Sequence, residues 1–354
     1  MLLVDKPEGP TSHDVVGWIR WGLGVSQVGH CGTLDPAASG LLVVCVGSAT
    51  RLVPYLTGVD KVYRARFALG RSTTTEDREG ETVTSAPAGP QERDAALVAL
   101  AALHGALMLP PPAFSAVKVD GQRAHRLARR GDALDLPPRP MHMHVVEALI
   151  KSPDETIEPW IDATVTVSKN TYVRSLTMEL GQRIEVPTHL AALRRLTSGA
   201  LRLDDARTVT GISAEPLPDP RPGLPPKLRL RLATGAGQGG IAGDRSALRT
   251  ALRAALLDPG EALPLPTVAM GADDPRMSAL TRLRHGQAVA VDADVAAWLP
   301  AGPPSAGEGL PMAARVALRA AGCLVIVRLE SAPGGDLLRP ERVLIAGDEP
   351  APLF

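Results

Sequence analysis

An aspartate in a glycine-flanked loop is the first residue whose type and setting suggest chemistry. The segment from Gly29 to Gly40, GHCGTLDPAASG, contains Asp35 directly before a proline. That proline biases Asp35 towards an extended backbone, and an ionised carboxylate can act as a covalent nucleophile. Taken alone, however, the pattern is more typical of a turn aspartate that caps neighbouring backbone amides. Asp35 therefore needs partners before it can be assigned to catalysis.

A tyrosine and an arginine lie in segments that could present them to such a carboxylate. Residues 61–69 alternate between apolar and charged side chains, which predicts a strand with Tyr63 on its inward, apolar face. Residues 161–168 alternate in the same way and lead into the segment 168–174, where we expect a helix to begin. Because a strand-to-helix junction fixes side chains while leaving their tips accessible, Arg174 is a candidate for chemistry there.

Other segments complete the first expected domain, residues 1–210, which reads as a mixture of strands and helices. The continuous apolar run 41–46 predicts a buried strand. Residues 117–121 predict a strand that runs into a turn, because Asp-Gly favours positive φ angles. Residues 123–130 predict a basic helix that stops at Gly131.

The composition changes after about residue 210. Prolines gather between 216 and 226 and glycines between 235 and 240, and such clusters cannot continue a helix or a sheet. Residues 211–262 are therefore expected to form a linker or insertion with a short helix. Residues 263–354 are expected to form a small β-rich domain, because short stretches typical of strands are separated by Gly/Pro turns at 288–291, 314–318, 323–329 and 342–345.

The overall composition restricts the class of protein. The formal net charge is zero, yet basic residues concentrate in 118–130 and 221–253. Such stretches favour an anionic partner without identifying it, and a solvated face is the alternative. The cysteines, Cys31, Cys45 and Cys323, lack metal-ligand spacing, and no apolar run approaches the roughly 18 residues of a membrane span. We therefore expect a reduced, cytoplasmic protein.

A series of motifs, in order, resembles the TruB family of tRNA pseudouridine synthases and covers residues 2 to about 200. The motifs are LVDKPEGPTS from Leu3, VGHCGTLDPAASGLL from Val28, DKVY from Asp60, LG and TTTED from Leu69 to Asp77, PPAFSAVK from Pro111, SKNTYVRSL from Ser168, and HL, LRRL and SG from His189 to Gly199. The resemblance implies an α+β pseudouridine synthase fold with a central mixed, mainly antiparallel sheet. A small, β-rich, PUA-like RNA-binding domain is implied at the C-terminal end.

The resemblance also implies a reaction. Uridine-55 in the T-loop of tRNA would be isomerised to pseudouridine by breaking the glycosidic bond, rotating the uracil and forming a carbon–carbon bond. A stacked uridine is out of reach, so the enzyme must extrude it. No cofactor and no metal are implied. The expected partner is the tRNA T-stem-loop, and we expect a monomer with no obligatory protein partner and no membrane association.

The resemblance implies catalytic roles for three residues of this chain. Asp35 would be the nucleophile, and Arg174 would hold it ionised, because a fixed guanidinium favours the charged carboxylate. Tyr63 would stack on the uracil and serve in the late proton transfer. Tyr172 and Leu193 would form the pocket wall, although a core role for Leu193 is nearly as well supported.

The remaining implied substrate-binding residues are a histidine and a set of basic side chains. His30 would stack in the remodelled T-loop. The basic side chains would grip phosphates without reading the sequence, or the lysines would instead buttress the site. They are Lys6, Lys61, Lys118, Lys169, Arg123, Arg126, Arg129 and Arg130. Two positions depart from the family pattern: His125 replaces a tyrosine, and Asn170 replaces a glycine whose left-handed backbone asparagine can tolerate.

Two alternative functions remain open at this point. The guide-dependent pseudouridine synthases of archaea and eukaryotes share the fold, but they need protein partners and carry different extensions, and the short N-terminal segment here disfavours them. A tRNA-folding chaperone with secondary or lost catalysis belongs to another class. The complete set of Asp35, Tyr63 and Arg174 disfavours lost catalysis, but it is compatible with a chaperone role beside catalysis.

Overall fold

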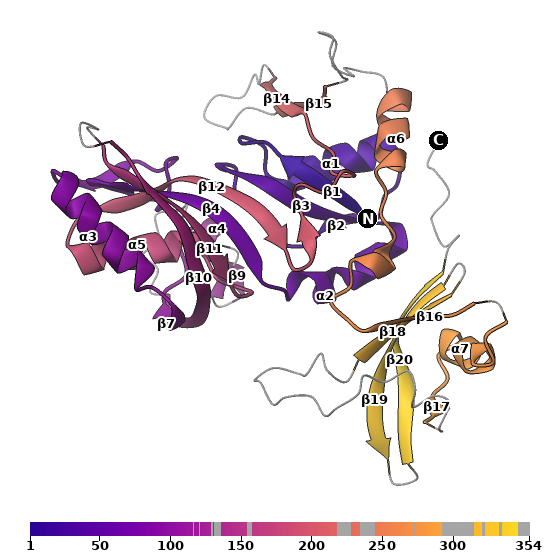
Figure 1. Cartoon of the computed structure of the whole chain (residues 1–354). Helices are drawn as coiled ribbons and strands as arrows, with labels where there is room; N and C mark the ends of the chain where they lie inside the picture. Colours follow the sequence, from indigo (N-terminus) through magenta and orange to yellow (C-terminus); the bar gives the residue numbers. More distant parts are fainter. Residues whose placement is uncertain are drawn as a thin grey trace.

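The largest element of the fold is a mixed sheet with the strand order β1-β3-β12-β4-β11-β10-β7, to which β2 and β13 add at β3 and β12 (Figure 1). The computed structural model describes residues 1–115, 117–119, 121–128, 130, 136–153, 158–217, 228–233, 245–271, 273–291, 315–320, 323–332 and 335–345. The strands are β1 Leu2–Lys6, β2 Val28–His30, β3 Ala38–Val46, β4 Lys61–Leu69, β7 Gly105–Leu109, β10 Arg139–Lys151, β11 Trp160–Val167, β12 Thr188–Ser198 and β13 Leu201–Arg202. Only β3 and β12 pair in parallel in this sheet. The predicted α+β class and mainly antiparallel sheet are confirmed.

One apolar core lies between this sheet and the helices α1 (Ser12–Leu23), α3 (Pro90–Ala101) and α5 (Val173–Ile184). Every second residue of β4, beginning with Tyr63, belongs to this core, as the alternating sequence predicted. Helix α1 begins at a capping box formed by Thr11 and Asp14, and it ends at Gly24 in the left-handed conformation. These signals fix both ends of the helix that precedes the Asp35 loop.

The shorter elements of the first domain include one departure from the prediction. They are η1 Gly47–Leu52, α2 Val53–Thr57, the hairpin of β5 Arg71–Thr73 and β6 Thr82–Ser85, the hairpin of β8 Lys118–Val119 and β9 Gln122–Arg123, and α4 Ala124–Ala128. The expected basic helix over 123–130 is thus shorter. Gly121, at φ +80°, turns the chain back, so that Arg123 pairs with Lys118 in a strand. Gly131, its expected end, lies outside the described residues.

The region 211–262 contains more regular structure than its proline and glycine content predicted. β14 (Ile212–Pro216) and β15 (Leu228–Leu232) pair in antiparallel fashion, and α6 (Arg245–Ala254) and η2 (Pro259–Glu261) follow. Pro216 ends β14, so the expectation that the proline cluster cannot continue a sheet is wrong at that residue. The other residues of the proline and glycine clusters lie outside the described residues. Leu248 and Leu252 of α6 join the main core, and α6 lies beside α1 in Figure 1. The expected short helix is present.

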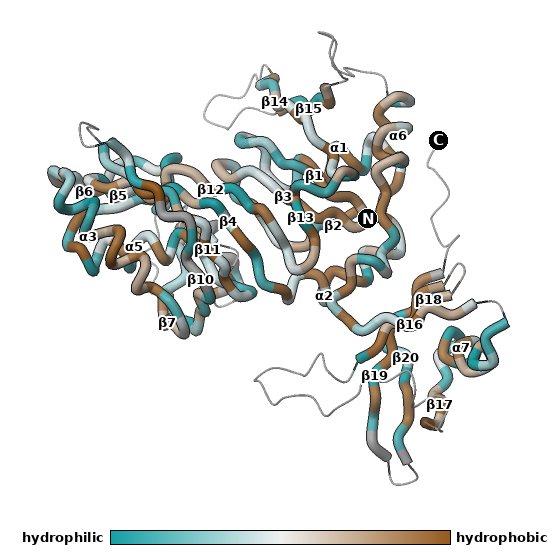
Figure 2. Tube along the Cα trace, in the orientation of Figure 1, coloured by the Kyte–Doolittle hydropathy of each residue, from teal (hydrophilic) through white to brown (hydrophobic). Residues whose placement is uncertain are grey.

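The C-terminal part is a five-stranded sheet with the order β16-β18-β19-β20-β17. Its elements are β16 Thr267–Ala269, α7 Met277–Arg284, β17 Val289–Ala290, β18 Arg315–Ala320, β19 Cys323–Ala332 and β20 Gly335–Ile345. The predicted β-rich character is confirmed, while its PUA-like identity and the three domain boundaries remain predictions. A second apolar core joins the two sheets, and Figure 2 shows hydrophobic segments on both sides of the junction. No helix within the described ranges is long and apolar enough to cross a membrane.

Candidate active site

The loop that carries Asp35 is fixed by side chains from two other segments. The Ser12 hydroxyl donates to the Leu34 carbonyl at 2.9 Å and accepts from the Leu34 amide at 2.8 Å. On the other side, the buried Arg195 guanidinium donates to the carbonyl oxygens of Leu41 at 2.6 Å and Gly32 at 3.0 Å. The backbone of the loop is therefore held in place before any substrate binds.

A glycine at the end of this loop is required by a close backbone approach. Gly40 has a φ of +99°, and a Cβ at this position would collide with the backbone of Arg195. Gly40 lies opposite Arg195 in the parallel pair of β3 and β12. Only glycine combines this conformation with this contact, so the loop can return directly into the buried strand.

Asp35 is held by an ion pair with Arg174. The Arg174 Nη2 lies 2.9 Å from Asp35 Oδ2, and the side chains are 6% and 39% exposed respectively. The same guanidinium donates to the carbonyl oxygens of Thr75 and Phe114, each at 3.0 Å. Arg174 lies in the first turn of α5, as the expected strand-to-helix junction required. The site thus presents a partly exposed carboxylate against a buried cation that also donates to two backbone carbonyls.

The two tyrosines occupy different positions relative to this ion pair. Tyr172 is the N-cap residue of α5 and interacts electrostatically with Arg174 and Asp35. Burial is the largest cause that raises the pKa of Tyr172, and the Arg174 charge opposes it. Tyr63 is buried on β4 opposite Arg195. Among the described residues, no hydrogen bond joins Tyr63 to Asp35, so its proposed contact with the uracil remains a prediction.

Leu193 and His30 line the surroundings of the Asp35 loop. Leu193, on β12, is half-buried, pairs with Ala38, and packs against the main core. His30 is half-buried and makes an edge-to-face contact with His13 at 5.3 Å between ring centroids. Burial, with the charges of neighbouring groups, lowers the pKa of His30 to about 4. A neutral ring is compatible with the predicted stacking role and not with a phosphate ion pair.

Two lysines predicted to bind substrate have buried amines that face the protein. Lys6 is 0% exposed, and its Nζ donates to the carbonyls of Pro7 at 2.9 Å and Pro10 at 2.8 Å and lies 3.4 Å from that of Pro36. Lys61 is buried and donates to the carbonyl of Thr57 at 2.8 Å. Burial lowers the pKa of each lysine to about 8. These placements favour the buttressing alternative, while the substrate-binding assignment of both lysines stays a prediction.

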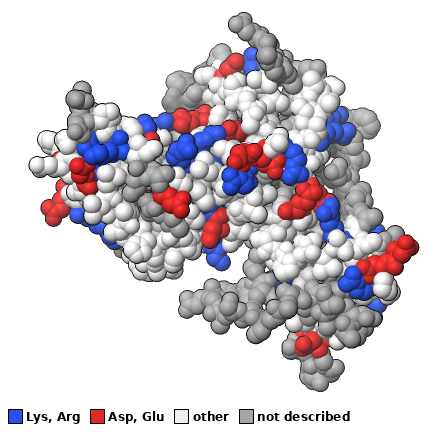
Figure 3. All heavy atoms as spheres, in the orientation of Figure 1, with Lys and Arg blue, Asp and Glu red and all other residues white. Residues whose placement is uncertain are grey.

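The other basic residues named from the sequence are exposed at the surface or lie outside the description. Lys169 is exposed in the turn before α5, where Asn170 has the expected left-handed φ of +65°. Arg126 and Arg130 are exposed on and after α4. The side chains of Lys118 and Arg123, and the whole of Arg129, lie outside the described residues. On the face shown in Figure 3, acidic and basic side chains alternate and do not form one basic area.

Part of the second basic stretch stabilises the fold. The Arg245 Nε donates to the Trp21 carbonyl at 2.7 Å, and the Arg249 Nε lies 3.4 Å from the Gly22 carbonyl. Cations at these carbonyls neutralise the negative end of α1. Arg231 pairs with Glu215 across β14 and β15 at 3.0 Å. These three arginines therefore make contacts within the protein, and an anionic partner for the basic stretch stays a prediction.

Sequence reasoning gave no role to two residues at the site. Arg195 was quoted only within a motif. It holds the Asp35 loop because its buried side chain, on β12, donates to the carbonyls of Gly32 and Leu41, and this contact is not evident from the sequence. Glu76 was likewise quoted only within a motif, yet it lies beside Arg174 and its Oε2 is buried. The described residues include no group of three His, Cys, Asp or Glu side chains suited to a metal ion. That no cofactor or metal is needed stays a prediction.

The comparisons of this chain with known proteins agree on one family of relatives. Residues 20–173 match the model of the TruB family pseudouridylate synthase (N terminal domain). A tRNA pseudouridine synthase B of Thermobifida fusca is 45% identical over 219 residues, which are 61% of this chain and 74% of the relative. Its counterpart in Arthrobacter sp. is 42% identical over 216 residues, 61% of this chain and 71% of the relative.

Solved structures extend the similarity of fold to the whole chain. A chain in the crystal structure of a Cbf5-Nop10-Gar1 complex has a TM-score of 0.61 at 22% identity, over 98% of this chain and 85% of that one. A chain in an H/ACA RNP bound to a substrate RNA has a TM-score of 0.58 at 20% identity, over 99% and 87%. At these identities the similarity concerns the fold alone.

The fold and the site together define an α+β enzyme with a carboxylate in its candidate active site. The similarity to these relatives identifies the family: the chain belongs to the TruB family of pseudouridylate synthases. It is therefore a pseudouridine synthase, which is an isomerase.

Proposed function

We propose that this enzyme converts uridine-55 in the T-loop of tRNA to pseudouridine, with Asp35 as the nucleophile. The observation that carries the proposal is the ion pair between Asp35 and the buried Arg174. The similarity to relatives named tRNA pseudouridine synthase B supports a catalytic meaning of this ion pair. The T-stem-loop of tRNA is the proposed partner, and the enzyme acts as a monomer without an obligatory protein partner.

The geometry supports a nucleophile that is kept charged without being blocked. Arg174 satisfies one oxygen of Asp35 and is itself anchored by Thr75 and Phe114. Asp35 remains 39% exposed, so a uridine turned out of its stack can reach it. Tyr63 is proposed to stack on the uracil, Tyr172 and Leu193 to form the pocket wall, and His30 to stack in the opened loop. Lys169, Arg126 and Arg130 are proposed to contact the RNA backbone.

Pseudouridine mapping on an unmodified tRNA transcript tests the proposal. The wild-type enzyme is expected to produce pseudouridine at position 55 alone, and Asp35→Asn is expected to bind the transcript without product. Asp204→Asn is the matched control, because Asp204 is an exposed carboxylate that pairs with Arg202. Binding without product by the wild type as well would leave a tRNA-binding chaperone. Product at another position would reject the assignment to uridine-55.

A further inference from the structure

Two arginines of α6 converge on the C-terminal end of α1. The Nη2 atoms of Arg245 and Arg249 lie 3.0 and 3.1 Å from the place that a Cβ of Gly24 would occupy, so the two guanidiniums meet over this glycine. The Nε atoms are turned towards the helix, at 2.7 Å from the Trp21 carbonyl and 3.4 Å from the Gly22 carbonyl respectively. Within the described residues, neither Nη2 atom has a hydrogen-bond partner.

No carboxylate balances these charges in the two segments that meet here. Residues 15–34 and 245–257 contain four arginines and no acidic residue. In the part of the chain that the structure describes, none of these arginines forms an ion pair, whereas Arg183 at the end of α5 pairs with Glu179 at 2.8 Å. The C-terminal end of a helix carries roughly half a negative charge. Two guanidiniums exceed it, so a net positive charge remains after α1 has been capped.

An aromatic ring lies beside the two guanidiniums. Trp21 is 47% exposed, and the guanidinium carbon of Arg245 lies 5.9 Å from the centroid of its ring. An exposed aromatic ring next to arginines is typical of surfaces that bind nucleic acids, because bases stack on the ring while the cations hold the backbone. The chemistry of this surface therefore fits RNA better than an acidic peptide.

We propose that Trp21, Gly24, Arg245 and Arg249, the α1–α6 surface, bind the tRNA substrate outside the active site. The two Nη2 atoms hold one backbone phosphate, for which a guanidinium is the best-matched donor. Trp21 packs against a neighbouring base. The inference rests on the proposed function, because it takes tRNA as the partner.

Helix α1 connects this surface to the Asp35 loop. Ser12, at the start of the helix, holds Leu34 of that loop. His13 and Gly24 are separated by close to three helical turns, so they lie on the same side of α1, about 16 Å apart along its axis. The ring of His13 contacts that of His30, which is proposed to stack in the T-loop. One RNA molecule can therefore reach both places along one side of the helix.

Filter binding of an unmodified tRNA transcript over a series of salt concentrations tests this inference. Arg245→Gln combined with Arg249→Gln removes both charges but keeps amide donors for the helix carbonyls. We expect its affinity for tRNA to fall about ten-fold and the slope of log affinity against log salt to decrease by about 1. Arg183→Gln is the matched control, because that arginine also lies at a helix end but is paired. It should bind as the wild type does.

Arg245→Lys combined with Arg249→Lys separates charge from packing. Lysine still binds phosphate as a point charge, so this variant should keep the salt slope of the wild type. A purely structural role in joining α6 to α1 would instead weaken binding in the lysine and glutamine variants alike. That result, or wild-type affinity and slope in the glutamine variant, would overturn the phosphate site.

Trp21→Leu tests the contact with a base. Its affinity should fall about five-fold with an unchanged salt slope, because stacking releases no counterions, and wild-type affinity would overturn this contact. None of these measurements requires product. If the wild type binds tRNA without forming pseudouridine, the proposed function fails, while the binding data still decide this inference. If the wild type does not bind tRNA, both fail.

Discussion

At the scale of single residues, the site depends on cations that already donate to backbone carbonyls of the protein. Arg174 donates to two backbone carbonyls from separate loops while it pairs with Asp35. Lys6 donates to backbone carbonyls beside the same loop. Neither is a free surface charge. Their common effect is to fix the chain around Asp35, so substitutions there should affect geometry before they affect RNA affinity.

Replacing Arg174 by lysine tests this view at the ion pair. A lysine keeps the charge, but its compact ammonium cannot reproduce the planar fork that meets Asp35, Thr75 and Phe114 together. We expect the rate of product formation to fall by about 100-fold, as for other losses of a fixed electrostatic contact, with tRNA affinity within about two-fold. Single-turnover rates and filter binding measure the two quantities. An equal loss of rate and affinity would contradict a role specific to catalysis.

Lys6 and Lys169 form a matched pair of buried and exposed lysines. Lys6→Met leaves carbonyl acceptors without their donor, so the free energy of unfolding should fall by about 2 kcal/mol. The salt dependence of tRNA binding should not change. Lys169→Met should leave stability unchanged and reduce the slope of log affinity against log salt by about 1. Urea denaturation and salt titrations measure both. A changed salt slope in Lys6→Met would support a phosphate contact for Lys6 and contradict a purely buttressing role.

At the scale of elements, the sequence predicted what local periodicity encodes. The alternation in β4 and β11 gave both strands and the inward side of Tyr63, and the junction before α5 placed Arg174. β14 and β15 were missed, because proline and glycine dominate the surrounding segment while the pairing of the strands is non-local. Glu76 was missed for a related reason. Its proximity to Arg174 arises from tertiary contacts that no spacing in the sequence reveals.

Helix α1 contains two glycines at which substitution by alanine is expected to have opposite effects on stability. A Cβ at Gly22 would lie 2.8 Å from Leu248 Cδ2 and 3.0 Å from Leu252 Cδ1, whereas a Cβ at Gly17 meets nothing within 4 Å. Gly22→Ala should therefore force α6 outwards and lower the free energy of unfolding by about 1–3 kcal/mol. Gly17→Ala should raise it by about 0.5–1 kcal/mol, because alanine favours the helix. Chemical denaturation measures both, and equal effects would contradict the close packing of α1 and α6.

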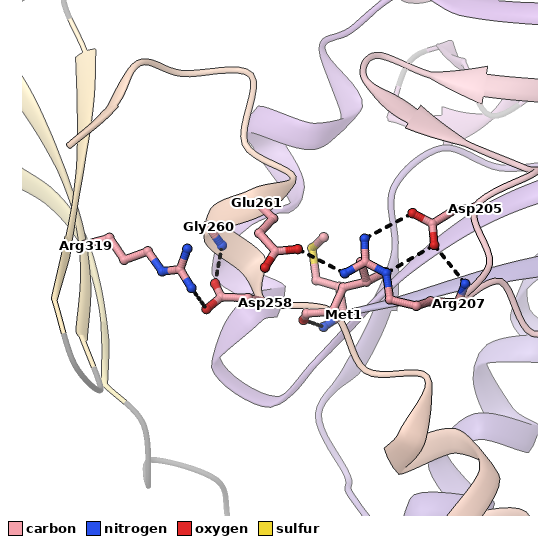
Figure 4. A network of polar contacts seen from close by, with 8 residues as sticks. Met1, Asp205, Arg207, Asp258, Gly260, Glu261 and Arg319 are labelled. Atoms are coloured by element: carbon pink, nitrogen blue, oxygen red, sulfur yellow. Dashed lines mark hydrogen bonds and ion pairs between the residues drawn. The ribbon is translucent and has the colours of Figure 1, made fainter. Parts of the chain in front are cut away.

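At the scale of the whole molecule, two kinds of contact join the C-terminal sheet to the catalytic part. Figure 4 shows a polar network in which Arg207 pairs with Glu261 at 3.0 Å and Arg319 pairs with Asp258 at 2.7 Å. The side chains of the first pair are 47% and 46% exposed. Beneath them, Leu3 of β1 and Ile326 of β19 belong to one apolar core. Because exposed ion pairs contribute little, the apolar core should decide whether the two parts behave as one.

Two substitutions at this junction separate these contributions. Ile326 is 0% exposed in the shared core, and Ile326→Ala should lower the free energy of unfolding by about 2–4 kcal/mol through lost burial and a cavity. Arg207→Gln removes the exposed pairs of that side chain and should cost less than about 1 kcal/mol. A core shared by both sheets also predicts one cooperative transition for the wild type. Differential scanning calorimetry measures the stability of both variants and the number of transitions in the wild type. Two separate transitions in the wild type would show that the two parts unfold independently and are not coupled by the core. A larger loss in Arg207→Gln than in Ile326→Ala would show that surface charges contribute more than the core to the junction.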